Sequence, residues 1–155
     1  MNPQNLLAEL GQKMNLPAVV LDAQGMAKLV FDAKVEVNIE HDANANQLHL
    51  YTILGQAPVT NAAPVLEKLL AGNLFGQATQ GAVLAIDPLT DDILITTTLN
   101  PDKTDMVDFE KALELHVSAA EQWMDTLRDV RAESAPSPVF DTTANENFHA
   151  SYLRA

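Results

Sequence analysis

The residues of this chain that could perform acid–base or metal chemistry gather in one acidic segment. Seven carboxylates lie between positions 87 and 110, with Lys103 as the single base among them: Asp87, Asp91, Asp92, Asp102, Asp105, Asp108 and Glu110. Such a group suits a divalent cation or a carboxylate dyad. However, these acids fall in expected turns and at a helix start, where Asp caps the backbone, and their spacing matches no calcium loop. We therefore expect structural carboxylates, and a metal-dependent enzyme using the acids from Asp91 to Asp108 stays an alternative.

The other residue types that support catalysis lack the required spacing. The four histidines lie far apart, and none forms an i, i+4 pair: His41, His49, His116 and His149. The absence of cysteine excludes a thiolate nucleophile, a thiolate zinc site and a disulfide. No Gly-x-Ser-x-Gly motif occurs, and the segment 76–83 has Ala82 and Val83 where a phosphate loop needs Lys and Ser or Thr. The sequence predicts a binding protein, not an enzyme, with no metal and no cofactor.

The charge balance restricts the partners. The chain has 155 residues, of which 21 are acidic and 9 are basic, so its net charge is -12. The basic residues are scattered from Lys13 to Arg154, which disfavours nucleic acids and acidic lipid surfaces. No stretch approaches the ~20 apolar residues of a membrane span, and the start lacks a signal-peptide pattern. We expect a cytoplasmic protein without membrane insertion.

Two hydrophobic periods predict the elements of the first half. Apolar residues at spacings of three and four predict a helix that starts near Pro3 and ends before Pro17. From Ala18 to Leu54 the period is two, as in strands, beginning with Val19 and Leu21. The breaks are short and rich in Asp, Asn and Gly, as antiparallel hairpins require. We expect a helix followed by three strands.

The second half repeats the same two patterns. A helix is predicted over 65–75, two strands over 82–86 and 93–99, and a long helix over 105–132. The order α-β-β-β-α-β-β-α predicts an α+β fold with an antiparallel sheet covered by helices. We expect one domain over 1–132 and a mobile tail over 133–155, because Pro136 and Pro138 interrupt the helical pattern.

The predicted helix over 65–75 has more apolar surface than one small domain needs. Its apolar residues lie on more than one side, whereas a surface helix normally presents a single apolar stripe. A partner subunit is the simplest cover for the excess. We expect a homodimer with these residues at the interface: Leu66, Leu69, Leu70, Leu74 and Phe75.

The segment from Val65 to Asp87 combines a leucine-rich helix, an Asn-Leu-hydrophobic step, a glycine-containing turn and a strand that ends in an acid. This block resembles the centre of the class I type III secretion chaperones, the Tir-chaperone-like (CesT-like) family. The resemblance is carried by these residues: Leu69, Leu70, Asn73, Leu74, Phe75, Gly81, Leu84 and Asp87. Element order, size and acidity extend the resemblance to about Ala132.

The resemblance implies a compact heart-shaped α+β fold, a homodimer and a location in the bacterial cytoplasm. Chaperones of this family wrap the unfolded N-terminal segment of a secreted effector, with one effector strand added to the sheet edge, and a secretion ATPase later removes the effector. We expect effector binding at Leu6, Leu10, Leu29 and Phe31, although ordinary core positions would show the same pattern. A small dimeric regulatory or ligand-binding α+β domain unrelated to secretion stays open as the second reading.

Overall fold

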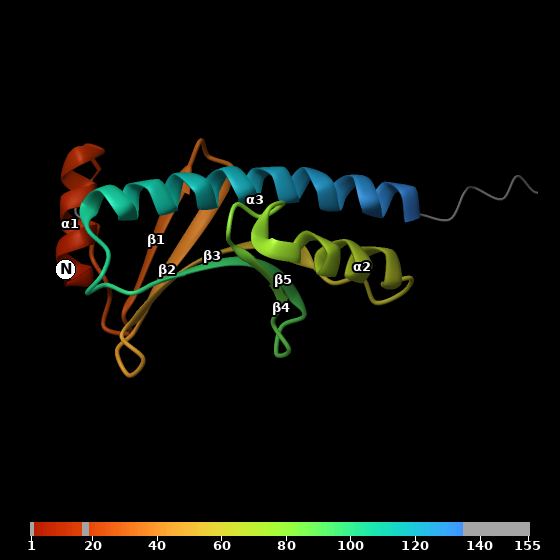
Figure 1. The fold of residues 1–155 in the computed structure, drawn as a ribbon, viewed down its shortest axis with the longest axis horizontal. Helices are drawn as coiled ribbons and strands as arrows, with labels where there is room; N and C mark the ends of the chain where they lie inside the picture. Colours follow the sequence, from red (N-terminus) through yellow and green to blue (C-terminus); the bar gives the residue numbers. More distant parts are fainter. Residues whose placement is uncertain (1, 17–18, 135–155) are drawn as a thin grey trace, which may run out of the picture.

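A computed structural model describes residues 2–16 and 19–134 (Figure 1). The elements are α1 (Pro3–Lys13), β1 (Met26–Phe31), β2 (Val35–Asp42), β3 (Gln47–Gln56), α2 (Ala63–Gly72), the 3-10 helix η1 (Leu74–Gly76), β4 (Val83–Ile86), β5 (Asp92–Leu99) and α3 (Met106–Ser134). This order confirms the predicted α-β-β-β-α-β-β-α pattern. The tail was predicted to begin at residue 133, but residues 133 and 134 still belong to α3. The rest of the predicted tail lies outside the described residues.

The strands form one antiparallel sheet in the order β1-β2-β3-β5-β4, so that β1 and β4 are its edges. Figure 1 shows α3 lying along one face of this sheet, with α1 crossing near one end of α3 and α2 beside its other end. The expected α+β architecture is confirmed. The covered face is called the inner face below.

The core lies between α3 and the inner face. Alternate residues of the central strands point inward and are buried, as a period of two requires: Val35, Val37, Ile39, Leu48, Leu50, Ile93 and Ile95. From α3, Phe109, Leu113, Trp123 and Leu127 cover them with a stripe at helical spacing. Fully burying one such side chain contributes about 1.5–3 kcal/mol, so this layer supplies most of the hydrophobic stabilisation.

The prediction of a strand around Val19 and Leu21 is wrong, because residues 19–22 form no strand. The N–H of Asp22 donates to the C=O of Met26 at 2.8 Å, and the Asp22 carboxylate accepts the Met26 N–H at 2.9 Å. These two bonds close a local turn in place of a strand ladder. Val19 is buried, and a Cβ added to Gly11 of α1 would lie 3.3 Å from its Cγ2, so Val19 packs on the helix.

Gly72 permits the close packing of α2 on α3. A Cβ placed on Gly72 would lie 2.3 Å from Cζ2 of Trp123, which is far inside van der Waals contact. The indole cannot withdraw freely, because Trp123 is buried and its Nε1–H donates to the C=O of Ala78 at 2.8 Å. The glycine is therefore required by the distance between the two helices.

We predict that Gly72→Ala lowers the free energy of unfolding by about 1–3 kcal/mol, as overpacking does in a filled core. Gly11→Ala is the matched control, because its new Cβ meets only Val19 at 3.3 Å and a helix interior favours Ala over Gly by about 0.5–1 kcal/mol. Chemical denaturation of the three proteins measures both changes. Equal stability of the Gly72→Ala variant and the wild type would contradict this account of the packing.

His116 is a buried polar residue of α3, with 1% of its surface exposed. The hydroxyl of Thr52 donates to the C=O of Glu36 at 2.9 Å, so it accepts a hydrogen bond from Nε2–H of His116 at 3.1 Å. Nδ1 therefore carries no proton and accepts from the hydroxyl of Thr97 at 3.0 Å. Burial lowers the pKa of His116 from 6.5 to about 4, so the ring is neutral in the fold.

We predict that His116 makes the fold sensitive to acid. The unfolded chain takes up its proton near pH 6.5 and the folded chain only near pH 4, so stability is complete above pH 6.5 and falls as the pH decreases through this window. At pH 5 the loss from this group is about 2 kcal/mol. Denaturation at pH 7 and pH 5 should show a smaller pH effect in His116→Gln than in the wild type; identical pH effects would refute the assignment.

Candidate functional site: apolar surfaces at the two sheet edges

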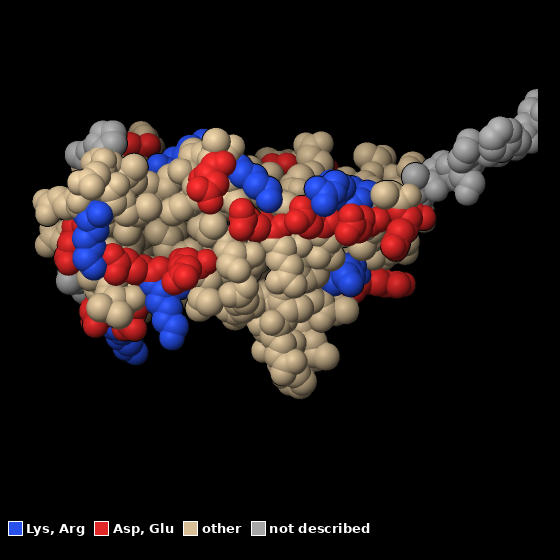
Figure 2. Space-filling model, turned by 90° about the horizontal axis from the view of Figure 1, so that it is seen from above, with Lys and Arg blue, Asp and Glu red and all other residues tan. Residues whose placement is uncertain are grey.

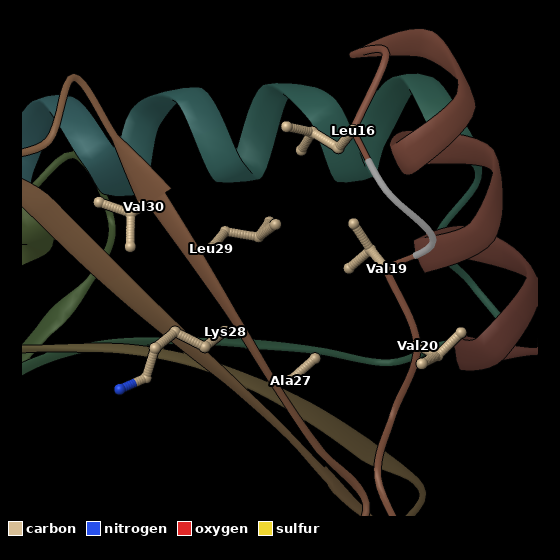
Figure 3. A pocket seen from close by; sticks show the side chains of 7 residues that line it. All are labelled: Leu16, Val19, Val20, Ala27, Lys28, Leu29 and Val30. Atoms are coloured by element: carbon tan, nitrogen blue, oxygen red, sulfur yellow. The ribbon is translucent and has the colours of Figure 1, made fainter.

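Each edge of the sheet carries an apolar surface. Beside β1 lies a groove of about 340 Å³, here called the edge groove, lined by Leu16, Val19, Val20, Ala27, Lys28, Leu29 and Val30 (Figure 3). Beside β4 lies the α2–β4 surface, whose groove of about 300 Å³ is lined by Leu66, Leu69, Leu70, Asn73, Leu84, Ala85 and Ile86. Exposed apolar patches of this kind mark interaction sites more often than isolated apolar residues do.

The edge groove forms where the segment after α1 runs beside β1. Figure 3 shows Val19 and Leu29 pointing toward each other from these two segments, and both are buried. Val20 and Val30 remain 53% and 60% exposed, so the groove has a covered floor and an apolar rim. Lys28 points away from Val19 in Figure 3.

An ion pair between Lys28 and Glu36 lies beside the edge groove. Nζ of Lys28 lies 2.7 Å from Oε1 of Glu36 on the neighbouring strand, and this hydrogen bond holds the pKa of Glu36 below its usual value. Both side chains are about half exposed, so the pair adds little to stability. Neither charge enters the apolar floor of the groove.

The backbone of β1 is open to pairing along this groove. The N–H of His41 on β2 donates to the C=O of Gly25 at 2.9 Å, so residues 27, 29 and 31 face β2 and residues 26, 28 and 30 face outward. The outward groups of Met26 are bonded to Asp22. Within residues 2–16 and 19–134, no hydrogen bond is recorded for the outward N–H and C=O of Lys28 and Val30.

The α2–β4 surface contains the residues predicted for a subunit interface. Four of the five are exposed: Leu66 by 38%, Leu70 by 74%, Leu74 by 63% and Phe75 by 88%. The fifth, Leu69, is buried in the core of the chain itself. Val83 of β4 is also exposed, at 53%. The excess of apolar surface expected from the sequence is therefore present.

The four residues predicted to bind an effector lie in three different environments. Leu6 and Leu10 of α1 are fully covered in the core, with 0% and 1% exposure. Leu29 lies on the floor of the edge groove, and Phe31 is half-buried at the end of β1. Of the four, only Leu29 lines the groove; binding at all four stays a prediction.

Sequence reasoning missed Leu16, Val20 and Val30, which supply much of the groove. One signal for Val30 was available, because it is an apolar residue at a strand position that alternates with the inward Leu29 and Phe31. A second signal was Pro17, which separates Leu16 from Val20 and excludes this apolar run from a helix interior or a central strand.

Two carboxylates of the acidic segment, those of Asp87 and Asp105, accept hydrogen bonds from the backbone, which is the structural role expected for them. The Asp87 carboxylate accepts the N–H of Leu89 at 2.8 Å in a turn, and that of Asp105 accepts the N–H of Asp108 at 2.9 Å at the start of α3. Among the described residues, no group of three or more His, Asp or Glu side chains is close enough to hold a metal ion. Figure 2 shows further acidic side chains in a row, interspersed with a few basic ones.

Nothing in the described part of the chain has the length and hydropathy of a membrane-spanning helix.

The chain is similar in sequence to one protein family and in fold to several solved structures. The model of the Tir chaperone protein (CesT) family matches residues 5–124. The structure titled as the ExsC–ExsE complex is 24% identical, with a TM-score of 0.67, over 80% of this chain and 92% of that one. The Yersinia pestis type III secretion chaperone SycH, in complex with a fragment of YscM2, is 21% identical with a TM-score of 0.60, over 77% and 98% of the chains.

The same fold also occurs in a protein that is not described as a chaperone. YbjN of E. coli, titled a putative transcription regulator, is 13% identical with a TM-score of 0.55, over 85% of this chain and 95% of that one. A search of the curated proteins gives no match. At these identities the similar structures establish a shared fold, whereas the match over residues 5–124 concerns the sequence itself.

Proposed function

The chain belongs to the Tir chaperone protein (CesT) family, and on this premise we propose that it is a type III secretion chaperone for one or more effector proteins. It binds an extended N-terminal segment of the effector, keeps that segment unfolded and presents it to the secretion apparatus, where the ATPase removes it. The observation that carries the proposal is the backbone of Lys28 and Val30 beside the edge groove, whose outward N–H and C=O groups have no hydrogen-bond partner within residues 2–16 and 19–134.

An extended segment fits both features of this edge. Its main chain can exchange hydrogen bonds with the outward N–H and C=O groups of Lys28 and Val30, while alternate side chains enter the groove between Val19 and Leu29. A segment already paired within a folded domain has no free main-chain groups to offer. Binding here therefore selects unfolded chain, and apolar burial offsets the cost of ordering it.

The similar structures support a protein segment as the ligand. SycH is described as a type III secretion chaperone in complex with a fragment of another protein, and ExsC is described in a complex with ExsE. The competing reading, a regulatory domain, has the shared fold of YbjN in its favour. The two readings differ in what the edge groove binds.

We predict that Lys28→Pro abolishes effector binding and that Lys28→Ala preserves it. Proline removes the outward N–H of residue 28 without touching the β1–β2 ladder, because this N–H faces away from β2. Alanine also loses the ion pair with Glu36 but keeps the N–H, so the pair of variants isolates the main-chain bond. Co-expression with tagged effectors from the same locus, followed by co-purification, measures binding.

Two outcomes would count against this proposal. If both variants fold by circular dichroism and both retain the effector at the wild-type level, the β1 edge is not the binding site. If no effector from the locus co-purifies with the wild type, while native mass spectrometry shows a retained small molecule, the regulatory or ligand-binding reading replaces the chaperone.

We also propose a homodimer through the α2–β4 surface, and predict that Leu70→Asp splits it. Leu70 is 74% exposed beside three other exposed apolar residues, and a charge in such an interface has to be desolvated. Val107→Asp is the control, because Val107 is also exposed, at 69%, but lies at the start of α3, away from α2. Light scattering at micromolar concentration should report a monomer for Leu70→Asp and a dimer for the wild type and for Val107→Asp. A monomeric wild type would contradict the proposal.

A further inference from the structure

Part of the outer edge of β4 is closed by hydrogen bonds from residues of its own chain. The N–H of Asp87 donates to the C=O of Asp92 on β5 at 2.9 Å, so residues 83 and 85 face β5, whereas Ala82 just before β4 and Leu84 and Ile86 within it face outward. On an ordinary edge strand these outward groups would be free to pair with another chain. Here the outward groups of Ala82 and Leu84 have partners within the chain, and among the described residues only those of Ile86, at the end of β4, have none.

The side chain of Asn73 forms hydrogen bonds with both main-chain groups of Leu84. Its Nδ2 donates to the C=O of Leu84 at 2.9 Å, and its Oδ1 accepts the N–H of Leu84 at 2.8 Å. A primary carboxamide presents one donor and one acceptor side by side, as a residue of an opposing strand does. Asn73 therefore stands where a neighbouring strand would pair.

Thr79 bonds both outward groups of Ala82, one through its main chain and one through its side chain. The N–H of Ala82 donates to the C=O of Thr79 at 3.0 Å, and the hydroxyl of Thr79 donates to the C=O of Ala82 at 2.6 Å. Thr79 is fully buried, so these bonds are shielded from water. Four consecutive outward groups of residues 82–84 are thus bonded within the chain.

We propose that Asn73, supported by Thr79, is a specificity-determining residue that prevents strand addition at β4 and so restricts it to β1. The two edges differ in their backbone, because the outward groups of Lys28 and Val30 have no recorded bond within the described residues. Both edges border grooves of similar size, about 340 Å³ beside β1 and about 300 Å³ beside β4, so the size of the groove alone would not direct an extended segment to one of them. The restriction of effectors to β1 rests on the proposed function, but the closure of β4 does not.

The closure also determines how a second copy can use the α2–β4 surface. With the main chain of Leu84 occupied, subunits meet there through side chains such as Leu70 and Phe75, not through a continuous sheet. If β4 were open, its edge could pair with the open β1 edge of another copy. That contact joins two different surfaces, so it would repeat from copy to copy and build rings or open filaments larger than a dimer.

Asn73→Ala tests the closure without any effector, so its failure and the failure of the proposed function can be told apart. We expect the amide hydrogen of Leu84 to exchange at least tenfold faster than in the wild type, and light scattering to show species larger than the wild type that grow with concentration. Adding Lys28→Pro should return the size to that of the wild type. Gln80→Ala is the control, because it removes a neighbouring carboxamide that bonds Ser118 and not β4.

A structural role limited to the C-cap of α2 would lower the melting temperature of Asn73→Ala without enlarging the assembly. A folded Asn73→Ala variant with wild-type exchange at Leu84, or with wild-type size at its highest soluble concentration, would therefore overturn the proposal. If circular dichroism shows this variant unfolded, Asn73→Asp replaces it: the change is nearly isosteric, keeps an acceptor for the N–H of Leu84 and removes the donor to its C=O. A folded Asn73→Asp variant larger than the wild type supports the proposal, and one of wild-type size at its highest soluble concentration overturns it.

Discussion

The packing of α3 along the inner face of the sheet is the contact on which the rest of the structure depends. Its buried stripe, from Phe109 to Leu127, covers the central strands and holds α1 at one end and α2 at the other. The exposed side chains of the α2–β4 surface and of the rim of the edge groove, such as Leu70 and Val30, lie outside this core, and the partners proposed for them would cover apolar surface that the chain itself leaves exposed.

Periodicity predicted the elements well, because it reports which side of a helix or strand is buried. It failed at Val19 and Leu21, where alternation over three residues cannot be told from a buried connection that packs on Gly11. Periodicity also could not predict that His116 of α3 is buried in the core. Its ring can be buried because both of its nitrogens form hydrogen bonds, with Thr52 of β3 and Thr97 of β5. Tertiary hydrogen bonds of this kind have no local signature.

The candidate site was only partly predictable for the same reason. The excess apolar surface of α2 was visible as too many leucines for one stripe, and Leu70 is indeed exposed. By contrast, Leu6 and Leu10 show the same helical spacing and are covered, because α1 has a single stripe and the core takes it. Whether a strand edge is open or occupied depends on residues distant in the chain, as Asn73 and Leu84 show.

The open stretch of β1 is short, since it runs from the turn at Asp22–Met26 to the hairpin at residues 32–34 and offers two outward residues, Lys28 and Val30, within the described chain. On the proposed function, a guest strand shifted by two residues would keep these main-chain bonds, because the next residues of the extended segment take the same places, but every side chain would move to a different part of the groove. Main-chain pairing therefore sets the direction and spacing of the guest, and the choice between alignments is left to its side chains.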